Sequence, residues 1–306
     1  MGNEAGIESE HQLPDNNRPI WVPVVATVVS AAIISVISGG LNALFRRIIS
    51  GPTYTGSDTT WLTVLQTFGY LITAALGVLA AWLLVRFVDH RGIRNLGLNS
   101  GWRRGLIGAL IGLVVALAAS ALAILIGHGL GFLSGIELEW IYSGAPASQI
   151  ISGFAYAALV SILIGIGGNT LWCGYLLRSI SARPLIAVVV VAVVPSLVGF
   201  TPRPGQGMYS MQLAAWLPSL PAEIGVGLAI VAFAIVFRSV WAAVGVTVGR
   251  SLVTYAIPVP VGSPSTAGTL SVSVLAGVLF IIAALIALWV GRRRWQQFAE
   301  TGPFDV

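Results

Sequence analysis

Long apolar runs, separated by short loops that carry the charges, constrain the fold of this chain more than any other feature. A helix needs about 20 mostly apolar residues to span the hydrocarbon core of a bilayer. The chain of 306 residues is 56% hydrophobic and 9% charged, whereas a soluble domain carries about 25% charged residues. The pattern therefore predicts an all-α, polytopic membrane protein.

Eight apolar runs are long enough to be candidate spanning helices. They cover residues 21–45, 61–87, 105–133, 147–177, 184–200, 211–237, 239–257 and 268–290. The fifth run is short, and Pro218 and Pro221 interrupt the sixth, so seven spans or a re-entrant segment are the alternatives. We expect a transmembrane domain over residues 21–291, between a polar cytoplasmic tail (residues 1–20) and a cytoplasmic C-terminal tail (residues 292–306).

The arginines indicate how these helices are oriented. All 16 basic residues are Arg. With a cytoplasmic N-terminus, twelve of them fall on the inner side, at positions 18, 86, 91, 94, 103, 104, 178, 183, 238, 292, 293 and 294, against three outside, at 46, 47 and 203. This bias predicts that both termini are cytoplasmic. The arginines form no continuous basic stripe, which argues against nucleic acid as a partner and leaves the lipids of a bacterial plasma membrane as the expected surroundings.

The types of residue available limit the chemistry. A single cysteine, Cys173, excludes an intrachain disulfide, and the three histidines have no metal-ligand spacing. We therefore expect neither a metal nor another cofactor.

Five polar residues within the predicted spans are the candidates for a cavity or binding site. With a rise of about 1.5 Å per residue, Asn169, Thr247 and Ser251 come out at similar depths of roughly 12 to 18 Å from the cytoplasmic ends of their spans. Glu223 and Arg250 lie at roughly 21 and 17 Å on consecutive spans. Hydrogen bonds between helices and a structural ion pair are the simplest roles for such groups, and a proton or substrate relay is the alternative.

Four segments, over roughly residues 80–290, resemble the CPBP family of intramembrane proteases, also called CAAX prenyl proteases or Abi-type self-immunity proteins. They are RFVDHRGIRNLGLNSGWRRGLIGALIGLVVAL (86–117), NTLWCGYLLRSI (169–180), PSLVGFTPRPGQG (195–207) and SVWAAVGVTVGRSLV (239–253). The last three are similar to the family's EExxxRGYLL, FxxxH and SLWAAIGLHFAWNFL motifs. The resemblance implies a CPBP-like helical bundle with an intramembrane catalytic centre.

The family's functional residues are replaced at every aligned position. In the first motif, the paired glutamates correspond to Gly168 and Asn169, and the arginine to Cys173. In the second, the phenylalanine and histidine correspond to Ser196 and Phe200. In the third, the histidine and asparagine correspond to Thr247 and Ser251. In the family, a glutamate and histidines are thought to activate water. Loss of a general base commonly costs about 100- to 10,000-fold in rate, so we expect no proteolysis at this site.

The sequence thus predicts a pseudoprotease that binds a peptide, a lipid-linked ligand or a partner helix without cleaving it. Two alternatives stay open. An active peptidase with an atypical site would use Glu223 as its base, and a transporter would use the Glu223 and Arg250 pair across a water-filled cavity.

Overall fold

A computed structural model describes residues 19–49, 59–90, 96–98, 101–133, 147–198, 217–256, 266–301 and 303–304. The regular structure in these ranges is entirely helical. The elements are α1 (Trp21–Ile49), α2 (Thr59–Leu83), the π-helix η2 (Leu84–Val88), α3 (Trp102–Gly129), α5 (Ala147–Asn169), the π-helix η4 (Thr170–Leu176), α6 (Leu177–Ser179), α7 (Pro184–Val198), the 3₁₀ turn η5 (Leu217–Ser219), α9 (Leu220–Phe237), α10 (Val240–Ala256), α11 (Thr266–Val290) and α12 (Arg292–Thr301).

Six helical stretches are long and apolar enough to cross a membrane, which makes the chain a multi-pass membrane protein. They are Trp21–Phe45, Thr63–Val88, Trp102–Gly129, Ile151–Ser179, Leu217–Phe237 and Leu270–Val290. The other two predicted spans correspond to α7 and α10, of 15 and 17 residues. At about 1.5 Å per residue, the described parts of these helices are roughly 22 and 26 Å long, shorter than a hydrocarbon core of about 30 Å. The structure therefore confirms the helical membrane fold but not the predicted count of eight spans.

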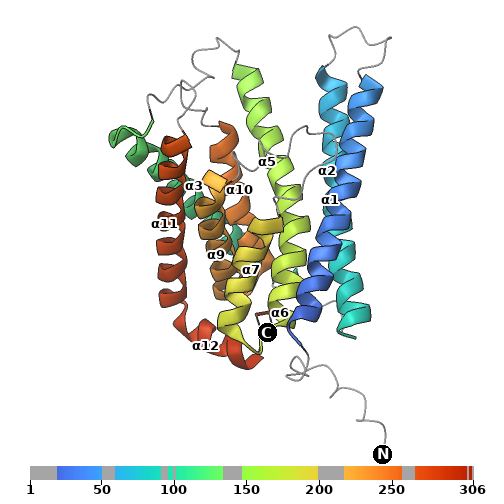
Figure 1. The fold of residues 1–306 in the computed structure, drawn as a ribbon, viewed down its shortest axis with the longest axis vertical. Helices are drawn as coiled ribbons and strands as arrows, with labels where there is room; N and C mark the ends of the chain where they lie inside the picture. The colour runs from blue at the N-terminus through green and yellow to red at the C-terminus, as the bar shows by residue number, and fades with distance from the viewer. Residues whose placement is uncertain are drawn as a thin grey trace, which may run out of the picture.

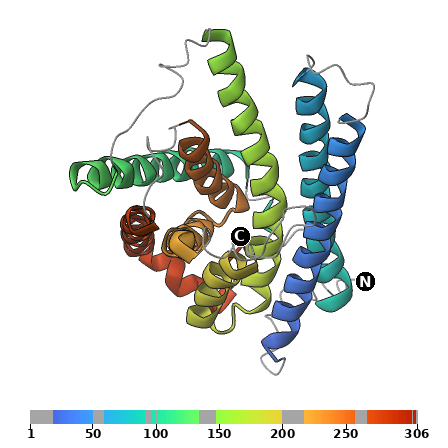
Figure 2. The ribbon, with the colours of Figure 1, turned by 45° about the horizontal axis from the view of Figure 1, so that its top comes forward.

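Helix α5 divides the molecule. The pair α1 and α2 packs on one side of it, and α3, α9, α10 and α11 gather on the other (Figure 1). Figure 2 shows that α3 lies across the direction of α5 instead of running beside it. The strong tilt of α3 brings it against α10, with which it forms the most extensive contact between two helices.

Helices α9 and α10 lie inside the bundle, whereas α7 keeps one face exposed. Half of the apolar stretch that contains α9 is buried, compared with 6–28% of the other five stretches. Helices α1, α2, α3 and α11 expose rows of large apolar side chains, among them Val29, Leu71, Val114 and Val278. Such rows are unfavourable in water but match the acyl chains of a bilayer.

Small residues set the distance between α3 and α10. A Cβ atom at Gly245 would overlap the carbonyl group of Ala109, and one at Gly249 would lie 2.9 Å from the Cβ of Ala116. From the other side, a Cβ at Gly112 would lie 2.6 Å from the carbonyl oxygen of Ala242. The backbones of the two helices are thus in direct contact, as is common where glycines line a crossing in a membrane protein.

The C-terminal segment packs against one end of the bundle. The backbone N–H of Val240, at the start of α10, donates to the carbonyl oxygen of Gly97 at 3.3 Å, and Gly97 in turn faces the ring of Phe304. Arg238 donates to the side-chain oxygen of Gln297 in α12 at 2.9 Å. Figure 1 places the start of α1 at this same end. The region predicted as a C-terminal tail thus contains a helix that caps the bundle.

Candidate functional site

A cavity of about 130 Å³ lies between the end of α5, the π-helix η4, α7 and α9. Four of the residues proposed from the sequence line it, namely Asn169, Cys173, Ser196 and Glu223. The remaining lining residues are Trp172, Val191, Ala192, Pro195, Val226, Gly227 and Ile230. The cavity thus combines a mostly apolar wall with an amide, a thiol, a hydroxyl and a carboxylate.

The π-helix η4 begins directly after Asn169 and carries Trp172 and Cys173. Its wider turn is evident at its end, where the N–H of Leu177 donates to the carbonyl of Trp172, five residues earlier. Short π-helical segments within α-helices occur frequently at functional sites. Cys173 is completely buried, and so is Thr170, whose hydroxyl oxygen has no hydrogen-bond partner in the described part of the chain.

Asn169 is joined to the helix that carries the third motif. Its side-chain nitrogen donates to the hydroxyl oxygen of Thr247 at 3.0 Å, and that hydroxyl donates to the carbonyl of Ala243, one turn earlier in α10, at 3.1 Å. Asn169 is itself buried, at 6% exposure. These bonds hold the amide in one orientation beside the cavity, and they show that Asn169 and Thr247 do lie at one level.

Ser196 approaches the cavity from α7. Its hydroxyl donates to the carbonyl of Ala192 at 3.2 Å, and the neighbouring Pro195 lies inside the helix. A proline within a helix leaves a backbone carbonyl without its usual donor. Helix α7 also packs tightly on α9, because a Cβ at Gly227 would overlap the carbonyl of Ala192.

Glu223 and Arg250 form an ion pair between α9 and α10, as their positions in the sequence suggested. Glu223 lies in the first turn of α9 and also lines the cavity. The side chains of Arg250 and Glu223 keep 30% and 31% of their surface exposed. The pair is therefore only partly buried, and its carboxylate is the one acidic group among the residues that line this cavity.

A second cavity, of about 160 Å³, shares Trp172 with the first as a lining residue. Gly168 and Trp172 line it together with residues of α1, α2, α5 and η4: Ala31, Ile34, Ser35, Thr73, Ala74, Gly77, Ile164, Gly167 and Leu171. A Cβ at Gly168 would meet no atom within 4 Å. Trp172 is the one residue that lines both cavities.

The remaining sequence candidates are not part of the central cavity. Ser251 lies one turn beyond Thr247 in α10 and is not among the residues that line it. Phe200 lies outside the described residues. Conversely, the sequence did not single out Trp172 or the π-helix. The polar Gly-Asn-Thr step before Trp172 was the only local sign that the helix is irregular there.

The side chains at the cavity can bind a ligand through hydrogen bonds and through the charge of one carboxylate. Within the ranges that the structure describes, no group of three His, Cys, Asp or Glu side chains lies close enough together to hold a metal ion. The amide of Asn169 and the hydroxyls of Ser196 and Thr247 are neutral donors and acceptors. The carboxylate of Glu223 is already bound to a guanidinium group.

Comparisons with known proteins provide no further assignment. No protein-family model matches the chain, and no curated protein or solved structure is significantly similar to it.

Proposed function

We propose that this protein is a non-catalytic relative of the CPBP intramembrane proteases, which binds a peptide, a lipid-linked ligand or a partner helix within the membrane without cleaving it. In this proposal α7 and α10 are also embedded in the membrane, giving eight spans, and both termini face the cytoplasm of a bacterial cell.

The observation that carries the proposal is the convergence of residues from distant segments. Asn169 and Cys173, from the first motif-like segment, share a cavity with Ser196 of the second. Thr247 of the third segment is hydrogen-bonded to Asn169. The resemblance to the CPBP family implies that these positions surround one site. The shared cavity and the hydrogen bond between Asn169 and Thr247 support the proposal.

The types of residue at this site support binding over catalysis. A general base must accept a proton near the operating pH, and the side chains of Asn169, Ser196 and Thr247 have no such titration. Cys173 has no His beside it in the cavity to activate a thiolate. The same groups are well suited to orient a ligand that carries amide or hydroxyl groups.

The ion pair of Glu223 and Arg250 bears on the two alternatives, an active peptidase and a transporter. Glu223 lines the cavity and is partly exposed, as a peptidase base or a transport site would require. However, its carboxylate is bound to Arg250, and a second acid or a histidine is missing among the lining residues. A structural ion pair at the edge of a binding cavity explains the same geometry and requires no second acid or histidine.

The size of the cavity indicates how a ligand would bind. At about 130 Å³ it admits a single side chain or a small head group, whereas pockets for whole ligands have volumes of about 300 to 1,000 Å³. Trp172 lines both this cavity and the second one, of about 160 Å³, so a rotation of its side chain would change the space available in each. We therefore propose that Trp172 moves when the ligand enters.

Alkylation of Cys173 tests the proposal, because this residue is the only cysteine and lines the cavity. We expect a farnesylated peptide, added to the purified protein, to slow the reaction of Cys173 with N-ethylmaleimide in a saturable manner and to be recovered intact by mass spectrometry. The same peptide without its farnesyl group is the control for non-specific effects. Cleavage of the peptide would support the peptidase alternative. An unchanged alkylation rate would contradict ligand binding at this cavity.

The proposed topology predicts where reporter fusions become active. A fusion at Glu300, within α12, should report a cytoplasmic location, and a fusion at Glu137 an external one. The expectation rests on the arginines, which favour the cytoplasmic side because they resist translocation. If both fusions report the same side, the proposed arrangement of the spans is wrong.

A further inference from the structure

We propose a second binding site, at the end of the bundle where α3 and α10 begin, and infer that it holds an anionic phospholipid. The site is a groove of about 510 Å³ lined by Leu98, Gly101, Trp102, Gly105, Leu106, Ala109 and Trp241. It is distinct from the central cavity, and the inference does not depend on the proposed function.

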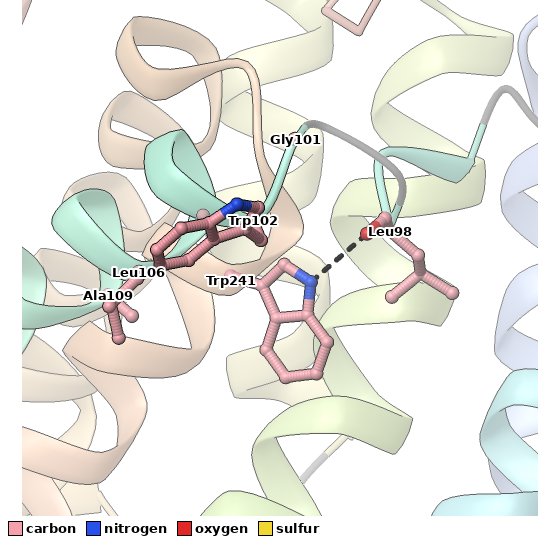
Figure 3. Close-up of a pocket in the computed structure, with 7 residues that line it drawn as sticks. Leu98, Gly101, Trp102, Leu106, Ala109 and Trp241 are labelled. Carbon is pink, nitrogen blue, oxygen red and sulfur yellow. Dashed lines mark hydrogen bonds between the residues drawn. The ribbon is translucent and has the colours of Figure 1, made fainter.

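The wall of the groove is suited to an acyl chain. Two indole rings, from Trp102 and Trp241, face it, and Gly101, Gly105 and Ala109 leave room beside α3 (Figure 3). The indole nitrogen of Trp241 donates to the carbonyl oxygen of Leu98 at 3.1 Å. Since its polar atom is satisfied within the protein, Trp241 offers the groove an apolar surface.

A positive charge lies beside the groove, on the Arg103 side chain that contacts Trp102. Arg103 and Arg104 follow Trp102 in the first turn of α3, and both are exposed. The guanidinium carbon of Arg103 lies 5.5 Å from the centre of the Trp102 ring, which itself lines the groove. In the part of the chain that the structure describes, neither arginine has an ion-pair partner.

The start of α3 adds to this attraction. Gly101, which precedes the helix, provides no side-chain cap, and the first N–H groups of an α-helix have no partner within the helix itself. The positive end of the helix dipole favours an anion there. A phosphate head group next to Arg103 and the start of α3, with its acyl chain in the groove, would satisfy both the charge and the apolar wall.

The position of the groove indicates that its occupant comes from the membrane. Trp102 is 74% exposed and Leu106 is 51% exposed, and a tryptophan beside arginines is typical of the boundary between head groups and acyl chains. Volumes of about 300 to 1,000 Å³ are usual for ligand sites, and the groove falls within that range. A phospholipid of the same leaflet needs no passage through water to reach it.

Fluorescence quenching in reconstituted vesicles tests the inference. The probes are phosphatidylglycerol and phosphatidylcholine with brominated acyl chains, each mixed into unlabelled phosphatidylcholine. The signal of Trp241 is the difference between the wild type and Trp241→Phe. One arginine near an anionic surface contributes about 1 kcal/mol. We therefore expect phosphatidylglycerol to quench Trp241 with an apparent affinity about 5- to 30-fold higher than phosphatidylcholine.

Two sets of variants complete the test. The double variant Arg103→Gln and Arg104→Gln should lose most of the preference, and Ala109→Phe, which fills the groove, should reduce quenching by both lipids. The control, Arg292→Gln with Arg293→Gln, removes the same charge from exposed positions in α12 and should keep the preference. Equal quenching by the two lipids, or equal losses in both double variants, would overturn the inference. Absence of quenching by either lipid would mean that protein covers the groove, for example a second copy of the chain, and would overturn it as well.

Discussion

Replacing Gly245 by alanine is expected to destabilise the protein strongly, by forcing two closely packed helices apart. The new Cβ atom would overlap the carbonyl of Ala109, which is backbone and cannot rotate away. Helices α3 and α10 would have to separate, and their contact is the most extensive between any two helices. Overpacking commonly costs about 1 to 3 kcal/mol, and a clash with backbone lies at or above the upper end. Thermal unfolding in detergent, with size-exclusion chromatography, measures the loss.

Gly40→Ala is the matched control for this experiment. Gly40 is a glycine in the exposed part of α1, and a Cβ there would meet no atom within 4 Å. Alanine stabilises a helix by up to about 1 kcal/mol relative to glycine, so this variant should unfold at the same temperature as the wild type or slightly higher. If Gly245→Ala behaved like Gly40→Ala, the close packing of α3 on α10 would be contradicted.

Breaking the ion pair between Glu223 and Arg250 should have the second largest effect. Loss of one partner of a fully buried pair typically costs about 3 to 5 kcal/mol, whereas an exposed pair contributes about 1 kcal/mol or less. Because both side chains keep about 30% of their surface exposed, we expect Glu223→Gln and Arg250→Met each to lose about 1 to 3 kcal/mol. The double variant should lose less than the sum of the two.

A double-mutant cycle, measured as thermal unfolding in detergent, separates coupling from independent effects. Arg292→Met, an exposed arginine in α12, is the control for loss of positive charge alone. Additive losses would mean that the two residues do not interact. Glu223 would then be an intramembrane acid without a stabilising partner, and the transport alternative would gain support.

Much of the fold could be predicted from hydropathy, because a spanning helix must satisfy its backbone internally and present apolar side chains to lipid. The same reasoning placed Glu223 near Arg250 and Asn169 near Thr247, since depth along a helix follows from the rise per residue. The ion pair and the hydrogen bond between these residues agree with that estimate.

Other features could not be read from the sequence for physical reasons. Helices α7 and α10 are apolar, like spanning helices, but are only 15 and 17 residues long within the described part of the chain, and hydropathy alone does not determine helix length. The π-helix η4 packs closely against a distant segment, since the carbonyl of Leu96 would lie only 2.9 Å from a Cβ at Gly174, and such contacts are not visible in a local sequence pattern. The two cavities that share Trp172 as a lining residue depend on how side chains of four different elements pack together.

The central claim is that residues from α7 and η4 share one cavity, and an intramolecular cross-link measures this most directly. Ser196→Cys adds a second thiol to a chain whose only cysteine is Cys173, and both positions line the cavity. A short bis-methanethiosulfonate, applied to membranes that contain this variant, should add a single spacer that joins both thiols, as intact-protein mass spectrometry would report. Gly40→Cys, on the exposed surface of α1, should gain separate adducts. Separate adducts at Cys173 and Ser196→Cys, without a joined product, would contradict the shared cavity.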